Sequence, residues 1–246
     1  MSHAADAFRV VIPARLGSSR FPGKPLALIE GRPMIEHVWR RACASAAQEV
    51  IVATDADEIV SACQSFGAEV VMTGVELRSG TDRVAEVARM RQWADRDIVV
   101  NVQGDAPMIP PDCINAVVRC MAGDPDAAMG TLCTPLADID DYRSTDVVKL
   151  VMDRDGRALY FSRAPIPARA HGAPAESPLF RHVGLYAYRV GALQTLAATP
   201  PCALELAESL EQLRALWLGM RIRVAVSEEP LAPDVDTPED IDRLAA

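Results

Sequence analysis

Residues 98–105 read I-V-V-N-V-Q-G-D, and this stretch decides the fold class of the chain. Apart from Asn101, its first five residues are apolar on both faces, which is typical of a central strand covered by helices on each side of a sheet. The stretch ends in Gln103, Gly104 and Asp105. In open α/β sheets, ligands bind beyond the carboxyl ends of the strands, so we expect these three residues to face a cleft.

Similar strand signals occur on the N-terminal side of this stretch. Short β-branched runs at residues 9–12, 50–53 and 69–72 are separated by segments long enough for helices. This alternation predicts βαβ units and a mainly parallel sheet. Pro33 is expected at the start of the first crossover helix and Gly67 at the end of the second. We therefore predict an α/β fold, a Rossmann-like three-layer domain with a mainly parallel mixed sheet.

The second half of the chain has a different pattern. Residues 147–152 and 157–161 flank a turn at residues 153–156 and predict a β-hairpin, which belongs to a smaller lobe. A Pro- and Ala-rich stretch at residues 164–178 predicts an irregular loop after the hairpin.

Two helices are expected near the C-terminus. Leu206, Leu210, Leu213 and Trp217 recur at helical spacing and predict a single helix that runs through them. The last helix should begin at Pro238, because a threonine cap precedes this proline and acidic residues fill the first turn.

Composition limits the partners of the protein. Its 246 residues, of which 50% are hydrophobic, suffice for one folded domain. The formal net charge of −9 argues against nucleic acid as a partner, since a phosphate backbone attracts clustered Lys and Arg. The six cysteines form no C-x-x-C pair and suggest neither a zinc site nor a disulfide scaffold. There is no signal-like N-terminus and no apolar run near ~20 residues, so we expect a cytoplasmic protein with no membrane partner.

The loop at residues 12–24, I-P-A-R-L-G-S-S-R-F-P-G-K, is cationic within an acidic protein. A strand, a glycine-containing loop and a helix suit phosphate, because backbone N–H groups can approach closely and cations neutralise the oxygens. The Walker pattern is absent, since five residues separate Gly17 from Gly23 and Pro25 follows Lys24. The alternative is that the cations of this loop are only solvated.

If this loop binds a polyphosphate, Mg²⁺ must be held by carboxylates from elsewhere in the chain. Asp105 is the first candidate because it follows the central strand, and a second carboxylate must come from a distant segment.

Motifs spread over nearly the whole chain carry a family resemblance. They are Pro13-Ala14-Arg15, Ser79-Gly80-Thr81-Asp82-Arg83, Asn101-Val102-Gln103-Gly104-Asp105, Ser162-Arg163-Ala164-Pro165, Arg181-His182-Val183-Gly184-Leu185-Tyr186, Leu210-Glu211-Gln212-Leu213-Arg214 and Val235-Asp236-Thr237-Pro238-Glu239-Asp240. In this combination the chain resembles the 3-deoxy-manno-octulosonate (KDO) cytidylyltransferases, a family within the sugar nucleotidyltransferase superfamily. The motifs of the second half are the more specific to that family.

The resemblance implies a reaction, a cofactor and an organisation. CMP would pass from CTP to KDO, an acidic eight-carbon sugar, giving CMP-KDO and pyrophosphate for lipopolysaccharide biosynthesis. The anomeric hydroxyl would attack the α-phosphate in line with the help of Mg²⁺. Residues 1–246 would form a single nucleotidyltransferase domain with a nucleotide-binding half (1–140), a sugar-binding and dimerisation lobe (141–200) and C-terminal helices that complete the active site (201–246). A homodimer is also implied.

The resemblance also assigns roles to individual residues. The catalytic set would be Arg15, Lys24, Asp105 and Asp236, of which Asp105 and Asp236 would hold Mg²⁺. The nucleotide would be bound by Pro13, Ala14, Arg15, Arg20, Lys24, Ser79, Gly80, Arg83 and Gln103. The sugar would be bound by Arg163, His182, Tyr186, Glu211 and Gln212.

Several of these residues have a purely structural alternative. Residues 79–81 could be a plain helix cap, with Arg83 as a surface cation. The remaining alternatives are a turn residue for Asp105, a residue beside a helix cap for Asp236, a structural histidine for His182, and a solvated helix face for Glu211 and Gln212.

One departure from the family concerns the substrate. The family usually has Glu where this chain has Ala106, and this difference leaves the exact sugar open. The alternative substrate is another acidic sugar, 8-amino-KDO or a sialic acid. The alternative class is a nucleotide-binding regulatory module without turnover.

Overall fold

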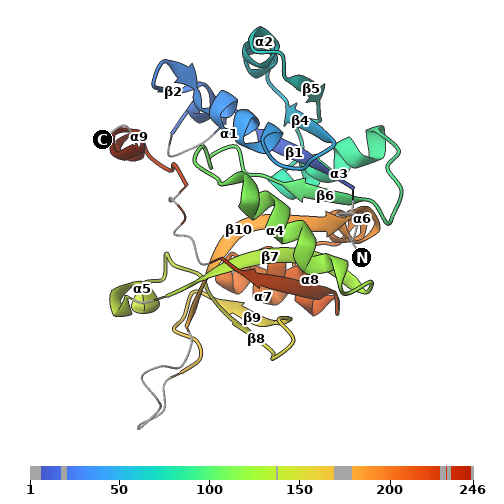
Figure 1. The fold of residues 1–246 in the computed structure, drawn as a ribbon, viewed down its shortest axis with the longest axis vertical. Helices are drawn as coiled ribbons and strands as arrows, with labels where there is room; N and C mark the ends of the chain where they lie inside the picture. The colour runs from blue at the N-terminus through green and yellow to red at the C-terminus, as the bar shows by residue number, and fades with distance from the viewer. Residues whose placement is uncertain are drawn as a thin grey trace.

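The computed structural model describes residues 7–17, 21–136, 138–168, 179–227, 231 and 234–244. Its main sheet runs through the middle of the molecule (Figure 1). The strand order along this sheet is β11 (Arg221–Val226), β7 (Ala127–Pro135), β10 (Phe180–Arg189), β6 (Ile98–Asn101), β1 (Phe8–Ala14), β4 (Glu49–Thr54) and β5 (Glu69–Met72).

Strand directions make this sheet mainly parallel but mixed. β1 pairs in parallel with both β4 and β6, and β4 pairs in parallel with β5. β10 runs antiparallel between β6 and β7, whereas β11 is parallel to β7. Every residue of β6 is buried, as expected for a strand covered on both faces. The predicted fold class and the predicted central strand are therefore confirmed.

Helices cover both faces of the sheet and give the three expected layers. One face packs against α1 (Met34–Cys43), α2 (Asp57–Ser65) and α4 (Pro111–Ala122), and the other against α3 (Gly80–Met90), α6 (Val190–Ala198) and α8 (Gln212–Trp217). Successive side chains of a strand point to opposite faces. Val10 accordingly joins the apolar core with Ile35 of α1, while Val11 joins the opposite core with Val84 of α3.

The first crossover helix begins one residue after the predicted proline. Pro33 ends the short strand β3 (Arg32–Pro33), which pairs with β2 (Leu28–Ile29), and α1 starts at Met34. Gly67 follows α2 with a φ of +82°, a left-handed conformation that suits glycine. The loop that precedes β2 contains the short 3-10 helix η1 (Lys24–Leu26).

The predicted hairpin is present beside β10. β8 (Lys149–Met152) and β9 (Ala158–Ser162) are antiparallel, and β8 also pairs with β10. Between β7 and β8 lies the short helix α5 (Ile139–Arg143). Residues 164–168 are irregular as predicted, while the rest of the predicted loop, residues 169–178, lies outside the described residues.

The prediction of one helix through residues 206–217 is wrong. The chain forms α7 (Ala203–Glu208), turns at Ser209 with a φ of +52°, and then forms α8. The guanidinium of Arg214 makes two hydrogen bonds of 2.8 Å to the Glu205 carboxylate, which fold α8 back against α7. Leu206 and Trp217, the outer members of the apolar pattern, are 69% and 61% exposed as a result.

The last helix, α9 (Pro238–Leu244), begins at the predicted proline. The segment before it returns to the N-terminal half, where buried Val235 packs with Ile29 and Met34. Figure 1 shows α9 beside β2 and α1. Among the described residues, no helix has the length and apolar character needed to cross a membrane.

Candidate active site

The strand register brings the predicted loops to one edge of the sheet. Pro13 and Ala14 at the end of β1 lie opposite the last two residues of β4, and Asn101 at the end of β6 lies opposite Val11. The loops that follow β1 and β6 therefore meet, as expected. They border a cleft of about 300 Å³, here called the large cleft, whose lining residues are Pro13, Ala14, Arg15, Lys24, Pro25, Leu77, Arg78, Ser79, Gly80, Arg83, Gln103, Gly104, Asp105 and Asp236.

Two glycines allow the loops to approach each other closely. A Cβ on Gly104 would lie 2.8 Å from the carbonyl oxygen of Pro13, a contact that the backbone could not accept. A Cβ on Gly80 would lie 3.1 Å from the ring of Pro13 and 3.5 Å from Oε1 of Gln103. The absence of side chains at these positions leaves backbone groups accessible at the floor of the large cleft.

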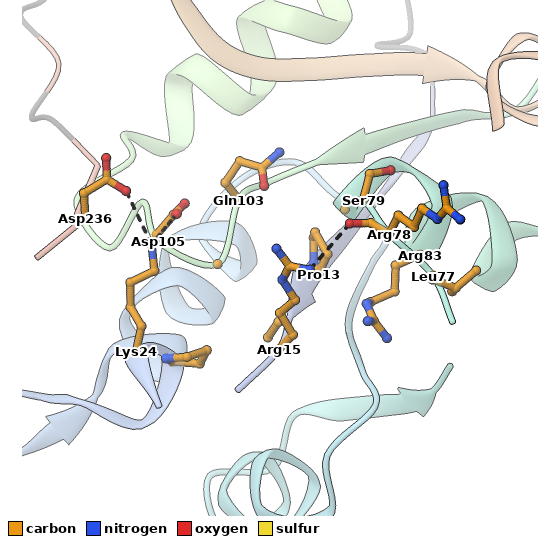
Figure 2. A pocket seen from close by; sticks show the side chains of 14 residues that line it. Pro13, Arg15, Lys24, Leu77, Arg78, Ser79, Arg83, Gln103, Asp105 and Asp236 are labelled. Atoms are coloured by element: carbon orange, nitrogen blue, oxygen red, sulfur yellow. Dashed lines mark hydrogen bonds and ion pairs between the residues drawn. The ribbon is translucent and has the colours of Figure 1, made fainter. Parts of the chain in front are cut away.

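One end of the large cleft is a cluster of a lysine and two carboxylates. Lys24 Nζ donates to Asp105 Oδ2 at 2.7 Å and to the Val235 carbonyl oxygen at 2.8 Å, and it lies 3.8 Å from Asp236 Oδ1. Figure 2 shows both carboxylates next to the end of the lysine side chain, with dashed lines that mark their interactions with it. Acids 131 positions apart in the sequence thus share one cation, although Asp105 follows β6 and Asp236 precedes α9.

The other end of the large cleft carries arginines. Arg15 Nη1 donates to the carbonyl oxygen of Arg78 at 3.5 Å. In Figure 2, Gln103 lies between this group and the lysine cluster. The arginine end of the large cleft suits an anion, whereas the lysine end has two carboxylates for one ammonium and suits a phosphate only together with a bound cation.

Arg83 is buried and is held from behind the cleft. Its side chain is 3% exposed, and Nη2 donates to Asp55 Oδ2 at 2.8 Å. Nη1 also donates to the Thr73 hydroxyl. The alternative reading of Arg83 as a surface cation is therefore wrong. Ser79 does cap α3, through a reciprocal pair of hydrogen bonds with Asp82, and it also lines the large cleft.

A second hollow of about 190 Å³, here called the small cavity, adjoins the large cleft. The two share Ser79, Gly80 and Gln103, and the other lining residues of the small cavity are Thr81, Met129, Tyr186, Tyr188, Leu196, Glu211 and Gln212. Three of the five predicted sugar-binding residues are in this set. The shared wall means that ligands in the two hollows would lie next to each other.

Buried polar atoms without partners occur in the small cavity at Gln212 and in the adjoining sheet at Asn101. Gln212 is 5% exposed and its Nε2 has no hydrogen-bond partner among the described residues. The same holds for both side-chain atoms of fully buried Asn101, which pairs with Tyr186 in the sheet. Buried polar atoms without partners are rare and often mark functional sites. The alternative of a solvated helix face is wrong for Gln212.

Burial is the main cause of the shifted pKa values of two residues that line the small cavity, Glu211 and Tyr186. It raises the pKa of the Glu211 carboxyl, although the nearby hydroxyl of Thr81 and the guanidinium of Arg214 act the other way. Burial also raises the pKa of Tyr186 well above its usual value, so this tyrosine stays a neutral hydroxyl. Tyr186 and Gln212 therefore offer neutral donors and acceptors to the cavity, which suit sugar hydroxyls.

Two predicted sugar-binding residues lie outside both hollows. His182 is partly buried, with its ring 5.4 Å from that of Tyr186 and its Nε2 3.0 Å from the Thr131 hydroxyl. Arg163 Nε donates to the Glu208 carbonyl oxygen at 2.8 Å and Nη1 to the Thr145 carbonyl oxygen at 2.9 Å. In the part of the chain that the structure describes, the side chains of Arg163 and His182 line neither the large cleft nor the small cavity.

Sequence reasoning missed some of the lining residues. Leu77 and Arg78 line the large cleft, and Tyr188 lines the small cavity. The position of Arg78, directly before Ser79 and Gly80, was a signal that could have identified it. Arg20, which is predicted to bind the nucleotide, lies outside the described residues.

The donor set at Lys24 fits a magnesium ion. Within the part of the chain that the structure describes, no three Asp, Glu, His or Cys side chains gather as a metal site. Mg²⁺ needs fewer protein ligands than that, because it is usually held by one or two carboxylates together with water and substrate phosphates. Asp105 and Asp236 provide such a pair of hard oxygen ligands. Their role as metal ligands stays a prediction.

A Rossmann-like sheet with a cationic, carboxylate-bearing cleft at its carboxyl edge defines a protein of the nucleotide-binding α/β class. Comparison with known proteins narrows the class. The sequence model of the family described as "Cytidylyltransferase" matches residues 9–222. A 3-deoxy-manno-octulosonate cytidylyltransferase of Pseudomonas syringae pv. syringae (strain B728a) is 52% identical over 245 residues, which cover 97% of this chain and 96% of that protein.

Further relatives agree with this result. A 3-deoxy-manno-octulosonate cytidylyltransferase of Thioalkalivibrio sulfidiphilus (strain HL-EbGR7) is 49% identical over 96% of this chain and 97% of its own. The solved structure of a CMP:2-keto-3-deoxy-manno-octonic acid synthetase complexed with CTP superposes with a TM-score of 0.91, at 41% identity and 97% coverage of both chains. The chain therefore belongs to the 3-deoxy-manno-octulosonate cytidylyltransferase family.

Proposed function

We propose that this protein transfers CMP from CTP to 3-deoxy-D-manno-octulosonate and releases pyrophosphate. The observation that carries the proposal is the shared wall of the two hollows, in which Ser79, Gly80 and Gln103 border both the large cleft and the small cavity. A transfer reaction needs its two substrates side by side with the reacting atoms in contact. CTP in the large cleft and the sugar in the small cavity meet this requirement.

The triphosphate of CTP is bound by charge. Arg15 at one end of the large cleft and Lys24 at the other neutralise phosphate oxygens, and Lys24 stabilises the charge that develops on the leaving pyrophosphate. Asp105 and Asp236 would hold Mg²⁺. When bound, this ion would neutralise the phosphate oxygens and orient them for in-line attack.

The shared wall and Arg83 recognise the cytosine ring. Gln103 has an amide that can both donate and accept, so it can match the exocyclic amine and the O2 atom of cytosine. Gly80 lets the base approach the backbone. The ion pair with Asp55 fixes the position of Arg83 at the edge of the cleft.

The small cavity binds the sugar. Tyr186 and Gln212 offer neutral hydrogen-bonding groups to its hydroxyls, and Glu211 accepts from them. His182 lies behind this cavity on β10, with its ring 5.4 Å from that of Tyr186, and Arg163 follows β9 of the hairpin. Arg163 provides the positive charge for the sugar carboxylate.

The test of the proposal is pyrophosphate release from purified protein with CTP, Mg²⁺ and a panel of acidic sugars. KDO should give the highest kcat/KM. A clear preference for 8-amino-KDO or a sialic acid would replace the proposed substrate. Release no faster than without any sugar, from folded protein, would favour a nucleotide-binding module instead.

The metal assignment has a separate test. In Asp105→Asn, Mg²⁺ should no longer raise the melting temperature in the presence of CTP, and turnover should fall by about 10²–10³-fold. Asp57→Asn, which changes an exposed acid at the start of α2, should behave like the wild type. An unchanged response to Mg²⁺ in the Asp105 variant would remove the assignment.

The remaining proposals concern the setting of the enzyme. We place it in the cytoplasm and in lipopolysaccharide biosynthesis, where CMP-KDO is used. We also propose a homodimer that forms through the β8–β9 hairpin and the loop after it, which is supported by Leu159 of β9 being 60% exposed. A monomeric mass from light scattering at assay concentrations would contradict this assembly.

A further inference from the structure

Three residues border both hollows, and Gln103 differs from the other two. Gly80 has no side chain, and the Ser79 hydroxyl accepts a hydrogen bond of 3.0 Å from the Asp82 backbone N–H as the cap of α3. The Gln103 amide makes no hydrogen bond to any residue that the structure describes, and no dashed line reaches it in Figure 2. Within the shared wall, the side chain with both a donor and an acceptor unused is therefore that of Gln103.

The surroundings of the Gln103 amide leave it room to turn. Gln103 is half-buried, and even a Cβ on Gly80 would lie 3.5 Å from its Oε1, so the glycine leaves that side of the amide open. The amide carries an acceptor, Oε1, at one end and a donor, Nε2, at the other. Ordering a long side chain such as glutamine costs conformational entropy, and a side chain without a partner keeps this freedom until a ligand binds.

A single amide that borders two hollows is ordered by whichever ligand binds first. A ligand in the large cleft that bonds to one end of the amide fixes its rotation, and the other end then has a fixed place on the wall of the small cavity. A second ligand that bonds to this end no longer meets the entropic cost of ordering the side chain. Binding in either hollow should therefore strengthen binding in the other by the same factor, because coupling between two sites is reciprocal.

We propose that Gln103 is the residue through which CTP and the sugar strengthen each other's binding, with one end of its amide on the cytosine ring and the other on a sugar hydroxyl. Cytosine can take either end, since its exocyclic amine donates and its O2 accepts, and a hydroxyl, which does both, suits the end that remains. The inference rests on the proposed function for the identity of the two ligands. It goes beyond that function, because two adjacent pockets with separate side chains would bind the same substrates independently.

The coupling is measured on the wild-type protein by calorimetric titration of KDO in the presence of Mg²⁺. One titration has no nucleotide, and the other has a saturating CTP analogue in which a methylene group replaces the oxygen between the α- and β-phosphates, so that no transfer occurs. The analogue should lower the Kd of KDO by about fivefold to tenfold, and KDO should lower the Kd of the analogue by the same factor. A change of less than about twofold would overturn the proposal, whether or not any variant folds.

A variant shows how much of the coupling passes through the amide. Gln103→Met keeps the length of the side chain but removes both hydrogen-bonding ends, and it leaves any direct contact between the two ligands in place. Because no described residue bonds to this amide, the melting temperature should stay the same while the coupling falls below about twofold. Gln64→Met, at an exposed position of α2, should keep the wild-type coupling. Coupling of wild-type size in Gln103→Met would refute the role of the amide.

Failure of this inference and failure of the proposed function can be told apart by pyrophosphate release. If the wild-type protein turns over CTP and KDO but the analogue does not change the Kd of KDO, only the inference is wrong. If KDO is neither bound nor turned over by folded protein, the proposed function is refuted and this inference is refuted with it.

Discussion

Lys24 is the residue on which the charge balance of the large cleft depends, and Lys24→Met tests this. The variant keeps the length of the aliphatic chain but removes the two hydrogen bonds of the ammonium to Asp105 and Val235. It also leaves the carboxylates of Asp105 and Asp236 facing each other without a cation. The change therefore affects both stability and catalysis.

The stability loss follows from how exposed these groups are. Removing one partner of a fully buried ion pair costs about 3–5 kcal/mol. The side chains of Asp105 and Asp236 are 29% and 44% exposed, so water replaces much of the lost interaction and we expect about 2 kcal/mol. In a chain of this size, that lowers the melting temperature by about 4–8 °C.

Catalysis should suffer more than stability. Loss of one group that stabilises developing charge costs about 10²–10³-fold in kcat, which pyrophosphate release at saturating CTP, KDO and Mg²⁺ would measure. Mg²⁺ should also stabilise the variant more than the wild type, because the ion no longer competes with the ammonium for the same carboxylates.

The control for this experiment is Arg154→Met, because the Arg154 side chain is 93% exposed in the hairpin turn. It should leave both the melting temperature and kcat unchanged. The reasoning would be refuted if Lys24→Met lost less than about tenfold in kcat, or if Mg²⁺ stabilised it no more than the wild type.

Two further predictions concern buried polar groups. Asp55→Asn leaves the charge of Arg83 unpaired, so the free energy of unfolding measured in urea should fall by about 3 kcal/mol. The control Asp57→Asn, at an exposed position, should lose far less. Equal losses would contradict the role of the ion pair. Gln212→Leu removes an amide without a partner, so the free energy of unfolding should stay the same or rise by about 1 kcal/mol while the sugar KM rises. A rise of the CTP KM by the same factor would count against this assignment.

The strands of the first half could be predicted because their signal is local. Residues 10–12 and, apart from Asn101, residues 98–102 are apolar on both faces, which is typical of a strand inside a covered parallel sheet. Parallel strands end at the same edge, so the meeting of the loops after β1 and β6 followed as well. These conclusions needed no knowledge of side-chain partners.

The break at Ser209 could not be predicted because its cause is not local. Leu206, Leu210 and Leu213 have the spacing of an unbroken helix. The chain turns because Arg214 pairs with Glu205 and donates to the carbonyl oxygens of Leu196 and Thr199. Carbonyl acceptors from the end of another helix leave no trace in the sequence around residue 209.

The same reason limits the prediction of the site. A sequence motif indicates which residue types are present but not which of their atoms are already engaged. Arg83 was open to two readings until its pairing with Asp55 was seen. From the sequence, Arg163 was expected to use its guanidinium for the sugar carboxylate. In the structure, its Nε and Nη1 donate to backbone carbonyl oxygens. Only the folded structure shows which donors remain for a ligand.

Val235 connects the candidate active site to the C-terminal segment through its backbone and its side chain. Its N–H donates to the carbonyl oxygen of Asp105 at 2.8 Å, its carbonyl oxygen accepts from Lys24, and its side chain is fully buried with Ile29 and Met34. The segment before α9 therefore docks only where the loops after β1 and β6 are already in place. Because the same contacts position the lysine and both carboxylates, any ligand that binds this cluster also stabilises the docked C-terminal segment. The large cleft is thus complete only in the folded chain as a whole, since neither half of the sequence contains all of its charges.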